Sequence, residues 1–394
     1  MDFHFTKEEE DFRQEVRQFL KEELNPDWIA PSSFMIYGEE KLWEGARKMA
    51  HKLGQKGWLT LGWPEEYGGV PGSYFKKLIL FEEMAYHGTP GVDPFGVKML
   101  APILLAYGTE EQKKRHLPPI ARGELTWCQG FSEPDAGSDL ASLRTQATEA
   151  GDCFTVNGQK VWTTGAHRAD WCFLLARTDP ESSRHRGLSF FLADMKSPGV
   201  TVSPIINILG EHCFNEIFFD NVVISKENLV GEKNKGWYVA MSLEGFERSG
   251  IEYCAECRRY VEKLVKFVKE AEENRGDISI KTSDVWRKLS KLTAMVEASR
   301  WLAYRVAWLQ SKGHEVAYEA PMSKVYGSEL MQYIGETWME ILGFYGQLVP
   351  GSRWAPFHGE IEKWCSGNLG RKFGGGTSEI QRNLIATMGL KLPR

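Results

Sequence analysis

Hydrophobic residues near the N-terminus recur with the period of an α-helix. Four of them occupy the i, i+4, i+7 and i+8 positions of one amphipathic stripe. This stripe consists of Phe12, Val16, Phe19 and Leu20. The run at residues 78–85 is apolar enough for a buried helix, and Gly and Pro residues separate the helical segments. Residues 1–123 are therefore predicted to form an N-terminal helical domain.

From about residue 125 the hydrophobic period changes to two, which is typical of β-strands. Asn157-Gly158 stands between two short strand-like runs, and this dipeptide favours the type I′ turn of a hairpin. Further strands are predicted at residues 171–176, 188–193, 200–203 and 216–219. Regularly spaced short strands are typical of a small barrel or sandwich. We expect a middle β domain over residues 124–235.

Residues 236–394 return to helical periodicity. One stripe consists of Val261, Leu264, Val265 and Val268. Longer helices are predicted at residues 284–312 and 320–342. A last helix is predicted after Gly376, with Ser378 and Gln381 as its capping box. We expect a C-terminal four-helix bundle, so the predicted fold class is α+β with several domains.

The composition excludes several classes of protein. A chain of 394 residues suits two or three domains, and 42% hydrophobic with 26% charged residues is typical of a globular protein. The net charge of -5 provides no basic surface for nucleic acid. We recognise no signal or transit peptide, and no apolar run approaches the roughly 18 residues of a membrane span. A cytoplasmic protein without a membrane span or a nucleic-acid partner is expected.

The seven cysteines are scattered without the spacing of a disulfide framework. In a chain of this size we interpret them as reduced thiols of the core. Cys254 and Cys257 form a C-x-x-C pair, a pattern that also occurs in metal and redox sites. This pair lies inside a helical pattern and has no second pair, so a core position is favoured and no metal site is predicted.

Three strings carry the candidate chemistry. FSEPDAGSD at residues 131–139 is a loop of small residues, which exposes backbone N–H donors, but it is not the G-x-G-x-x-G of a Rossmann dinucleotide site. NGQKVWTT occupies residues 157–164. GGGTSEIQR at residues 374–382 leads into a helix N-terminus, whose N–H groups suit an anion or a polarised carbonyl. Taken alone, each string is weak, and a structural turn or core strand is a competing interpretation.

In this order and along a chain of this length, the three strings resemble the TEPGAGSD, NGxKxWIT and GGTSEIQR sequences of the acyl-CoA dehydrogenase family. The resemblance covers nearly the whole chain and implies that family's fold and an FAD site. Ser132 would bind the edge of the isoalloxazine ring, and Trp162 and Thr164 would flank the ring and its N5 atom. Without the family, Trp162 fits a core position better. The other implied FAD contacts are Gln129, Gly130, Phe131, Gly137, Ser138, Thr163, Thr377, Ser378 and Glu379.

Gly375 stands where many members of the family have the catalytic Glu, so no side chain at this position can act as a base. The isovaleryl- and long-chain-type members instead place the base on an earlier helix, as a Glu directly before an Arg. Glu247-Arg248 matches that pair, which implies Glu247 as the base and Arg248 as a contact to CoA. The alternatives are a solvated Glu247 and an i, i+4 pair between Glu244 and Arg248.

The implied reaction is α,β-desaturation of an acyl-CoA thioester. An α-proton is too weakly acidic for a free carboxylate, so donors must polarise the carbonyl oxygen, and burial must raise the pKa of the base. The N–H of Gly375 and a ribityl hydroxyl of FAD would be these donors. Ser138 and Gly376 would also contact the substrate. Glu247 would take the α-proton while a β-hydride passes to flavin N5, and electron-transfer flavoprotein would accept the electrons.

Two segments that complete the FAD site across a subunit interface in this family are altered. Arg275 replaces the Arg of an Arg-x-x-Phe-Gly string, but the Phe-Gly is absent. The QILGG loop reads EILGF at residues 340–344, with Glu340 and Gly343 as the expected FAD contacts. Branches that act on pimeloyl-CoA and steroid side chains build each site from two different subunits and are closer to this chain. A homodimer, a homotetramer or a heterotetramer with a homologous subunit is expected.

The leading hypothesis is therefore an FAD-dependent acyl-CoA dehydrogenase of lipid metabolism and β-oxidation. One alternative is a non-catalytic or half-site subunit, which the altered Arg-x-x-Phe-Gly stretch favours and Glu247 opposes. Another is a flavin oxidase or monooxygenase, which rapid oxygen consumption would favour. The small residue at Gly375 leaves room for a branched, cyclic or bulky acyl group. Aromatic, dicarboxylic and straight-chain acyl groups stay open.

Overall fold

The computed structural model describes residues 4–30, 35–182, 184–246, 249–273 and 282–393. The chain forms two compact units, each assembled from separate stretches of sequence. The first unit comprises Met1–Ser33, Ser73–Thr89 and Arg248–Arg394, and the second comprises Phe34–Gly72 and Pro90–Glu247. The three domain ranges expected from the sequence, which follow chain order, stay a prediction.

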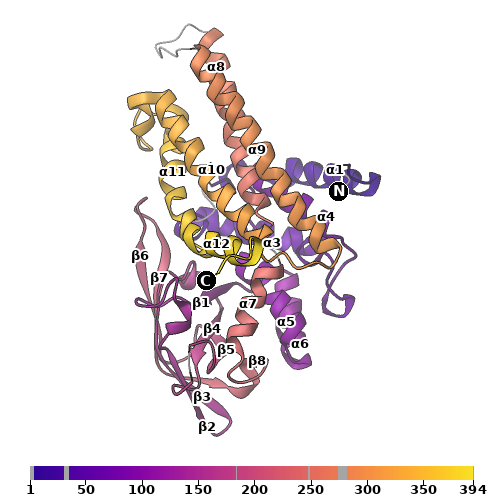
Figure 1. Ribbon diagram of the computed structural model, residues 1–394, viewed down its shortest axis with the longest axis vertical. Coiled ribbons are helices and arrows are strands. Elements are labelled where there is room, and N and C mark those ends of the chain that lie inside the picture. Colours follow the sequence, from indigo (N-terminus) through magenta and orange to yellow (C-terminus); the bar gives the residue numbers. More distant parts are fainter. Residues whose placement is uncertain (1–3, 31–34, 183, 247–248, 274–281, 394) are drawn as a thin grey trace. The chain divides into compact units, whose positions relative to one another are not determined.

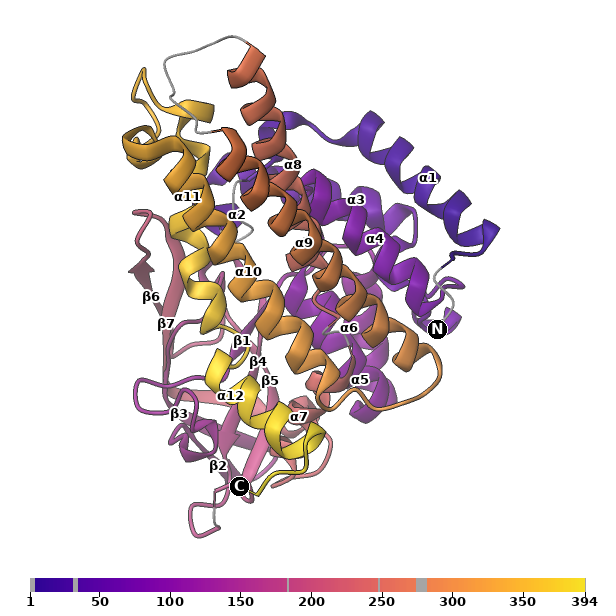
Figure 2. The same ribbon diagram turned by 45° about the horizontal axis from the view of Figure 1, so that its top comes forward.

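The first unit is built from helices (Figure 1). They are α1 (Lys7–Glu23), α4 (Tyr74–His87), α8 (Ile251–Glu273), α9 (Thr282–Ser311), α10 (Glu319–Leu342), α11 (Glu360–Gly367) and α12 (Ser378–Leu384). α8, α9 and α10 pack on one another, and α4 packs against α8 and α9. α12 lies beside α10, as Figure 2 shows. The predicted helical character of the C-terminal part is confirmed, and α1 and α4 from the N-terminal part join it in one unit.

Apolar stripes of these helices meet in one core. The stripe predicted within α8 is confirmed, since Val261, Leu264 and Val268 are buried there. They belong to the same hydrophobic cluster as Trp338 of α10 and Trp364 of α11, both with no exposed surface. Burial of aromatic side chains this large is a major source of stability in helical packing.

A network of charged side chains is buried where α1, α4 and α9 meet. Arg13 Nη1 lies 2.8 Å from Glu82 Oε2 and 2.6 Å from Glu83 Oε1. Arg300 of α9 binds Glu82 Oε1 (2.9 Å), and the Tyr304 hydroxyl donates to Glu82 Oε2 (2.7 Å). Burial raises the pKa of Glu82, but the charges of Arg13 and Arg300 outweigh it and lower the pKa overall. The Glu82 carboxylate therefore connects α1 and α9 to α4.

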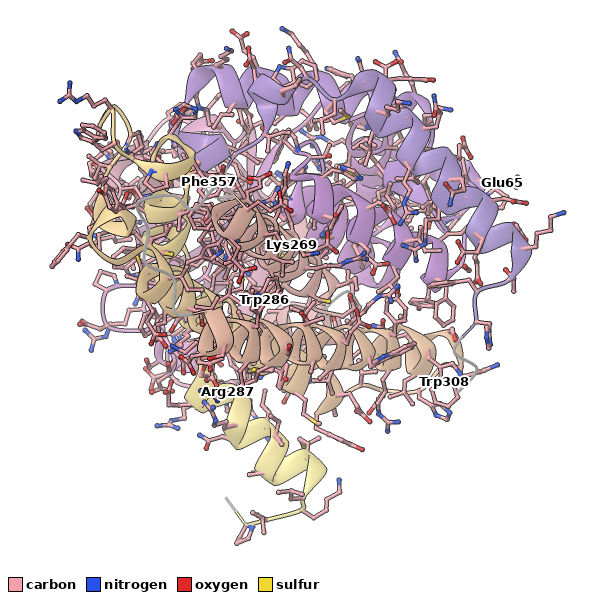
Figure 3. All side chains as sticks on the ribbon, turned by 90° about the horizontal axis from the view of Figure 1, so that it is seen from above. Glu65, Lys269, Trp286, Arg287, Trp308 and Phe357 are labelled. Atoms are coloured by element: carbon pink, nitrogen blue, oxygen red, sulfur yellow. The ribbon has the colours of Figure 1, made fainter. Side chains whose placement is uncertain are left out.

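The start of α9 is tied to both neighbouring helices. Figure 3 shows Trp286 and Arg287 near this start and Trp308 near the other end of α9. Trp286 Nε1 donates to Glu272 Oε1 of α8 (2.7 Å), and Lys288 Nζ donates to Glu340 Oε2 of α10 (2.6 Å). The Glu340 side chain is therefore engaged within the bundle.

The second unit combines shorter helices with a sheet. Besides short 3-10 turns, its helical segments are α2 (Met35–Gly38), α3 (Glu40–Gln55), η4 (Pro94–Leu100), α5 (Ala101–Tyr107), α6 (Glu110–Ala121) and α7 (Gly236–Phe246). Asp93 begins η4, because its carboxylate accepts from Phe95 N and Gly96 N (both 3.0 Å). The same carboxylate accepts from Trp127 N (3.1 Å) and so ties η4 to the first strand.

Eight strands form one sheet in the order β6-β7-β3-β2-β4-β5-β8, with β1 paired to β4 (Figure 1). They are β1 (Trp127–Gly130), β2 (Gln146–Ala150), β3 (Cys153–Lys160), β4 (Trp171–Arg177), β5 (Leu188–Asp194), β6 (Val200–Ile206), β7 (His212–Ser225) and β8 (Leu229–Val230). β4 pairs in parallel with β1 and β2, and the other pairs are antiparallel. The four strands predicted between residues 171 and 219 lie inside β4 to β7, which confirms a middle β domain.

The predicted hairpin at Asn157-Gly158 is wrong. β3 passes through both residues and pairs with β2 on one side and β7 on the other. The chain reverses earlier, at Gly151-Asp152, where Gly151 has φ 60°. Gly158 (φ 152°) instead sits at a register shift in the pairing with β7. Asn157 Oδ1 accepts from Asn221 N (2.8 Å) across that bulge, so the dipeptide serves an irregular strand.

Three expectations about absent features concern the described residues. All seven cysteines are described and are free thiols, and five of them are buried. Burial raises the pKa of Cys254 to about 12, which fits an unreactive core position for the C-x-x-C pair. In the described part of the chain, no cluster of three or more His, Cys, Asp or Glu could hold a metal ion. None of its helices is long and apolar enough to cross a membrane.

Candidate active site

The loop at residues 131–139 leaves β1 and closes on itself. Glu133 and Ala136 exchange backbone hydrogen bonds in both directions (3.0 and 3.1 Å). Ala136 is buried under this turn, whereas Gly137 and Ser138 are exposed. The turn therefore presents the main chain of Gly137 and Ser138 to solvent, as a loop that binds a polar ligand edge requires.

A buried ion pair anchors this loop to the sheet. Lys160 Nζ lies 2.8 Å from Glu133 Oε1 and also donates to Phe131 O (3.1 Å). Glu133 accepts in addition from Arg144 N (2.6 Å) and Thr145 N (2.8 Å). Burial raises the pKa of Glu133, but Lys160 and these donors lower it overall, while burial lowers the pKa of Lys160 to about 8. Both groups are therefore charged near neutral pH.

Sequence reasoning missed this pair. Both residues stand inside the strings that resemble the family, but a spacing of 27 residues gives no local signal of contact. The signal available was a Lys at the end of a strand, directly before the apolar pair Val161-Trp162, since a buried lysine requires a partner.

The segment of residues 161–165, called the strap below, follows β3. Its backbone bonds are Val161 N to Ser132 O (2.9 Å), Thr163 N to Asn215 O (3.0 Å) and Gly165 N to Cys213 O (2.9 Å). One end of the strap is therefore bonded to the 131–139 loop, and the rest is bonded to β7.

Trp162 occupies an unusual position in the strap. Its φ of 59° lies in the left-handed region, which costs a residue with a side chain about 1–2 kcal/mol. Its indole is 61% exposed and contacts Phe214 edge-on at 6.1 Å between ring centroids. A core position, the alternative left open by the sequence, does not match this exposure. The strap presents an aromatic face at the surface next to Thr164.

The glycine loop at residues 374–377 is held by its carbonyl oxygens. Lys324 Nζ of α10 donates to Gly376 O (2.8 Å), and Gln381 Nε2 donates to Gly375 O (3.0 Å). Gly375 and Gly376 have φ of 67° and 87°, a region that favours glycine. A Cβ at Gly375 would meet nothing within 4 Å, whereas one at Gly376 would lie 2.5 Å from Gln381 Nε2. The space beside Gly375 is therefore open.

The predicted capping box of the last helix is wrong by one residue. Thr377 is the N-cap, and its Oγ1 accepts from Ile380 N (3.2 Å). Ser378 is the first helical residue and is buried. The Gln381 side chain bonds to Gly375 O rather than to the N–H of the cap residue, because the left-handed glycines bring that carbonyl within its reach. The helix start still lies where the sequence placed it.

The first residue of α7, Gly236, packs directly against the backbone of the sheet. A Cβ on Gly236 would lie 2.4 Å from the Ser189 carbonyl carbon, so only glycine fits there. Asn234, with φ 68°, donates its N–H to Ser189 Oγ (2.8 Å) and accepts from Thr178 Oγ1 (2.5 Å). The helix that runs up to Phe246, directly before the proposed base, therefore begins at a fixed point of β5.

The predicted site residues are distributed over both units. Gln129, Gly130, Phe131, Ser132, Gly137, Ser138, Trp162, Thr163 and Thr164 lie in the second unit, on β1, the 131–139 loop and the strap. Gly375, Gly376, Thr377, Ser378, Glu379, Glu340 and Gly343 lie in the first unit. Glu340 binds Lys288, and Gly343 ends α10 with φ 55°. Glu247, Arg248 and Arg275 lie outside the described residues.

Three family models match the chain. The acyl-CoA dehydrogenase N-terminal domain matches residues 6–124, the middle domain matches residues 128–222, and the C-terminal domain matches residues 234–390. The chain is 36% identical to acyl-CoA dehydrogenase IpdE1 of Mycobacterium tuberculosis, with 98% of each chain covered. It is 33% identical to acyl-CoA dehydrogenase FadE26 of the same organism, with 100% and 99% covered.

Solved structures agree with these relatives. A steroid ACAD named Tcur3481-Tcur3483 superposes with a TM-score of 0.90 at 33% identity, with 100% of each chain covered. The ChsE4-ChsE5 complex from Mycobacterium tuberculosis has a TM-score of 0.87 at 32% identity, again with 100% covered. The three domain matches, the relatives and the fold all indicate the same family. The chain belongs to the acyl-CoA dehydrogenase family of flavoprotein oxidoreductases.

Proposed function

We propose that this chain is an FAD-dependent acyl-CoA dehydrogenase that introduces an α,β double bond into an acyl-CoA thioester. The observation that carries the proposal is the strap. Trp162 is an exposed indole in a left-handed conformation, at the position where the family resemblance places one wall of the flavin ring. The exposed indole offers a flat apolar face on which the ring of a ligand can stack.

Each unit, taken by itself, offers residues suited to contact FAD. Ser132 and the exposed main chain at Gly137 and Ser138 offer polar contacts to the ring edge, and Trp162 and Thr164 offer a flat wall. The N-terminus of α12, capped by Thr377 after two left-handed glycines, allows close approach of a ligand to the backbone. The remaining FAD contacts proposed there are Ser378 and Glu379, and those proposed in the second unit are Gln129, Gly130, Phe131 and Thr163. When bound, FAD supplies the hydride acceptor.

Residues of this chain remove the α-proton of the substrate and make it more acidic. The Glu247 carboxylate takes the α-proton, because Gly375 has no side chain to do so and Glu247 precedes Arg248 as in the isovaleryl- and long-chain-type members. The Gly375 N–H donates a hydrogen bond to the thioester carbonyl oxygen, which makes the α-proton more acidic. Positioning of base and carbonyl donor replaces the high concentration of base that the reaction needs in water.

A bulky acyl group is the proposed substrate class. The open space beside Gly375 leaves room next to the reacting carbons. The relative of known structure described as a steroid ACAD is consistent with a large cyclic acyl group. Ser138 and Gly376 are proposed to contact the thioester part, and Arg248 is proposed to contact CoA. Electron-transfer flavoprotein is the proposed electron acceptor.

A heteromeric assembly is the proposed form of the enzyme. Two of the similar structures are named for two proteins each, Tcur3481-Tcur3483 and ChsE4-ChsE5. In this chain the Arg-x-x-Phe-Gly string is incomplete at Arg275, and Glu340 replaces the Gln of the QILGG loop. Glu340 binds Lys288 rather than pointing freely from α10. A homologous subunit is therefore proposed to supply part of each FAD site.

The decisive experiment is anaerobic reduction of bound FAD. The chain is purified alone and with its co-purifying homologue, FAD is counted per polypeptide, and acyl-CoA esters of straight, branched and cyclic acids are mixed in without oxygen. We expect loss of the oxidised flavin absorbance with one class of ester. If no ester reduces FAD in either preparation, the proposal is wrong.

A matched pair of variants tests the base. Glu247→Gln is expected to slow flavin reduction by about 10²- to 10⁴-fold, the usual contribution of a general base. Glu244→Gln makes the same change three residues earlier and tests the alternative pair with Arg248. It is expected to leave the rate near that of the wild type. Equal rates in the wild type and Glu247→Gln would exclude Glu247 as the base.

The same assay separates the second candidate, a half-site subunit without its own catalysis. The altered segments at Arg275 and Glu340 favour it. A chain that takes up FAD only with the homologue, and whose Glu247→Gln variant leaves the complex fully active, would establish that role. Rapid oxygen uptake without another acceptor would instead indicate an oxidase.

A further inference from the structure

Asn215 of β7 makes three hydrogen bonds, two to Thr163 of the strap and one to His212. Its backbone carbonyl accepts from Thr163 N (3.0 Å), and its side-chain Nδ2 donates to Thr163 O (2.9 Å). Its Oδ1 lies 2.6 Å from His212 Nε2. The Asn215 side chain has no exposed surface. The backbone and side chain of one buried residue therefore bond both the N–H and the carbonyl of Thr163, which holds this residue of the strap in place.

The geometry fixes the orientation of both polar groups. Only the NH₂ of Asn215 can donate to the carbonyl of Thr163, so its Oδ1 faces His212 and acts as an acceptor. His212 must therefore carry a hydrogen on Nε2 to complete the bond. The ring of His167 stacks on His212 with 3.8 Å between centroids, and His167 Nε2 bonds to Tyr37 O (3.0 Å). His167 lies two residues after the strap, so this stacking connects the end of the strap to His212.

The strap needs such support at this position. β3 ends at Lys160, so the regular ladder with β7 stops at Ile217. On the other side of β7, Asn215 is paired with Pro204, which has no N–H to donate. Trp162 takes a left-handed conformation one residue before Thr163, and its ring contacts Phe214, the neighbour of Asn215. A strained conformation persists only where its surroundings determine it.

We propose that Asn215 is a positioning residue of the flavin site, which with His212 fixes the strap so that Trp162 and Thr164 meet the isoalloxazine ring in one geometry. This inference rests on the proposed function for the identity of the ligand. Asn215 touches neither the reacting atoms nor the cofactor. It acts through the peptide of Thr163, which lies between the two residues that do.

The test compares Asn215→Ala with Asn157→Ala in the FAD-loaded enzyme, with the partner subunit where loading requires it. Asn157 binds Asn221 through its own amide in the same sheet and has no contact with the strap. We expect Asn215→Ala to weaken FAD binding at least about tenfold and to change the visible spectrum of bound flavin. Asn157→Ala is expected to leave both unchanged. Wild-type FAD affinity and spectrum in Asn215→Ala would overturn the proposal.

Two His212 variants keep the proposal testable if Asn215→Ala does not fold. His212→Gln retains an N–H that can reach Asn215 Oδ1, and His212→Leu does not. His212→Leu is expected to reproduce the loss of FAD affinity, and His212→Gln to restore it. Equal, wild-type affinity in both variants would refute a role for this contact.

A readout without cofactor separates this inference from the proposed function. Hydrogen exchange at the Thr163 and Thr164 amides is measured in the FAD-free chain. His212→Leu is expected to speed this exchange while amides in β5 keep their protection. Unchanged exchange would overturn the positioning role even if FAD chemistry is confirmed. Faster exchange in a protein that never binds FAD would support the positioning of the strap and refute the flavin function alone.

Discussion

Two buried lysines, one in each compact unit, hold the two loops of the candidate site in different ways. Lys160 of the second unit has no exposed surface and pairs with the Glu133 carboxylate at 2.8 Å. Lys324 of the first unit is 6% exposed and donates to the backbone carbonyls of Lys372 and Gly376 at 3.3 and 2.8 Å. Lys160 thus holds its loop through a carboxylate side chain, and Lys324 holds its loop through backbone carbonyls.

This difference matches what each loop must do. The 131–139 loop has a Glu at a fixed place and side chains that pack, so an ion pair can hold it rigidly against the sheet. The glycine loop has neither, and Lys324 and Gln381 hold it by its carbonyl oxygens. Carbonyl anchoring fixes the path of the backbone without adding bulk beside Gly375, where a Cβ would meet nothing within 4 Å. An ion pair therefore supports the 131–139 loop, whereas hydrogen bonds to carbonyl oxygens support the glycine loop and leave the space beside Gly375 open.

The largest expected effect comes from breaking the ion pair. Lys160→Met leaves the Glu133 carboxylate buried without its counter-charge, which typically destabilises a protein by about 3–5 kcal/mol. Urea unfolding followed by circular dichroism measures the change. The double variant Lys160→Met, Glu133→Leu removes both charges and is expected to recover a large part of that loss. A single variant as stable as the wild type would show that the pair does not anchor the loop.

A smaller effect is expected for the second lysine. Lys324→Met leaves two carbonyl oxygens without this donor, which costs about 1–3 kcal/mol. The control is Lys266→Met on α8, because that side chain is 79% exposed. The control is expected to change stability by less than about 0.5 kcal/mol. If Lys324→Met destabilises the protein as much as Lys160→Met, the contrast between the two anchors is wrong.

The third prediction concerns the loss of stability at low pH in the second unit, which contains the strap. His116 of α6 is packed edge-on against Trp127 and Trp171, and burial, with help from Arg115, lowers its pKa to about 4. The unfolded chain binds this proton near pH 6.5 and the folded chain only near pH 4. Stability is therefore lost as the pH falls from 6.5 towards 4, by about 1–2 kcal/mol between pH 7 and pH 5.

His116→Phe should remove that part of the acid sensitivity, because Phe fills a similar space without titrating. Urea unfolding of wild type and variant at several pH values measures it. Two curves that fall in parallel between pH 7 and pH 5 would mean that other groups, not His116, bind the protons.

The sequence predicted the elements that have a long, regular pattern. The stripe in α8 and the strands from β4 to β7 lie where hydrophobic periodicity placed them. The hairpin at Asn157-Gly158 failed because a dipeptide that tolerates positive φ serves a bulge as well as a turn, and only the pairing of β3 with β7 distinguishes the two. The cap of α12 failed by one residue because Thr377 and Ser378 are both suitable caps.

The sequence predicted those parts of the candidate site that lie in recognisable motifs. The resemblance named the 131–139 loop, Trp162, Thr164 and the glycine loop. The supporting contacts were not visible in the sequence, because they join residues far apart in the chain. Glu133 meets Lys160, and Asn215 meets Thr163, through tertiary structure alone. Glu247, the proposed base, stays a prediction from its sequence neighbour and from Gly375.

The close contact between Gly236 and β5 fixes the position at which α7 begins. The backbone of its first residue touches the backbone of β5 so closely that no side chain fits between them. A side chain at this position would have to displace either α7 or the strand. The close fit at Gly236 therefore makes the placement of the helix depend on β5, the strand at which it begins.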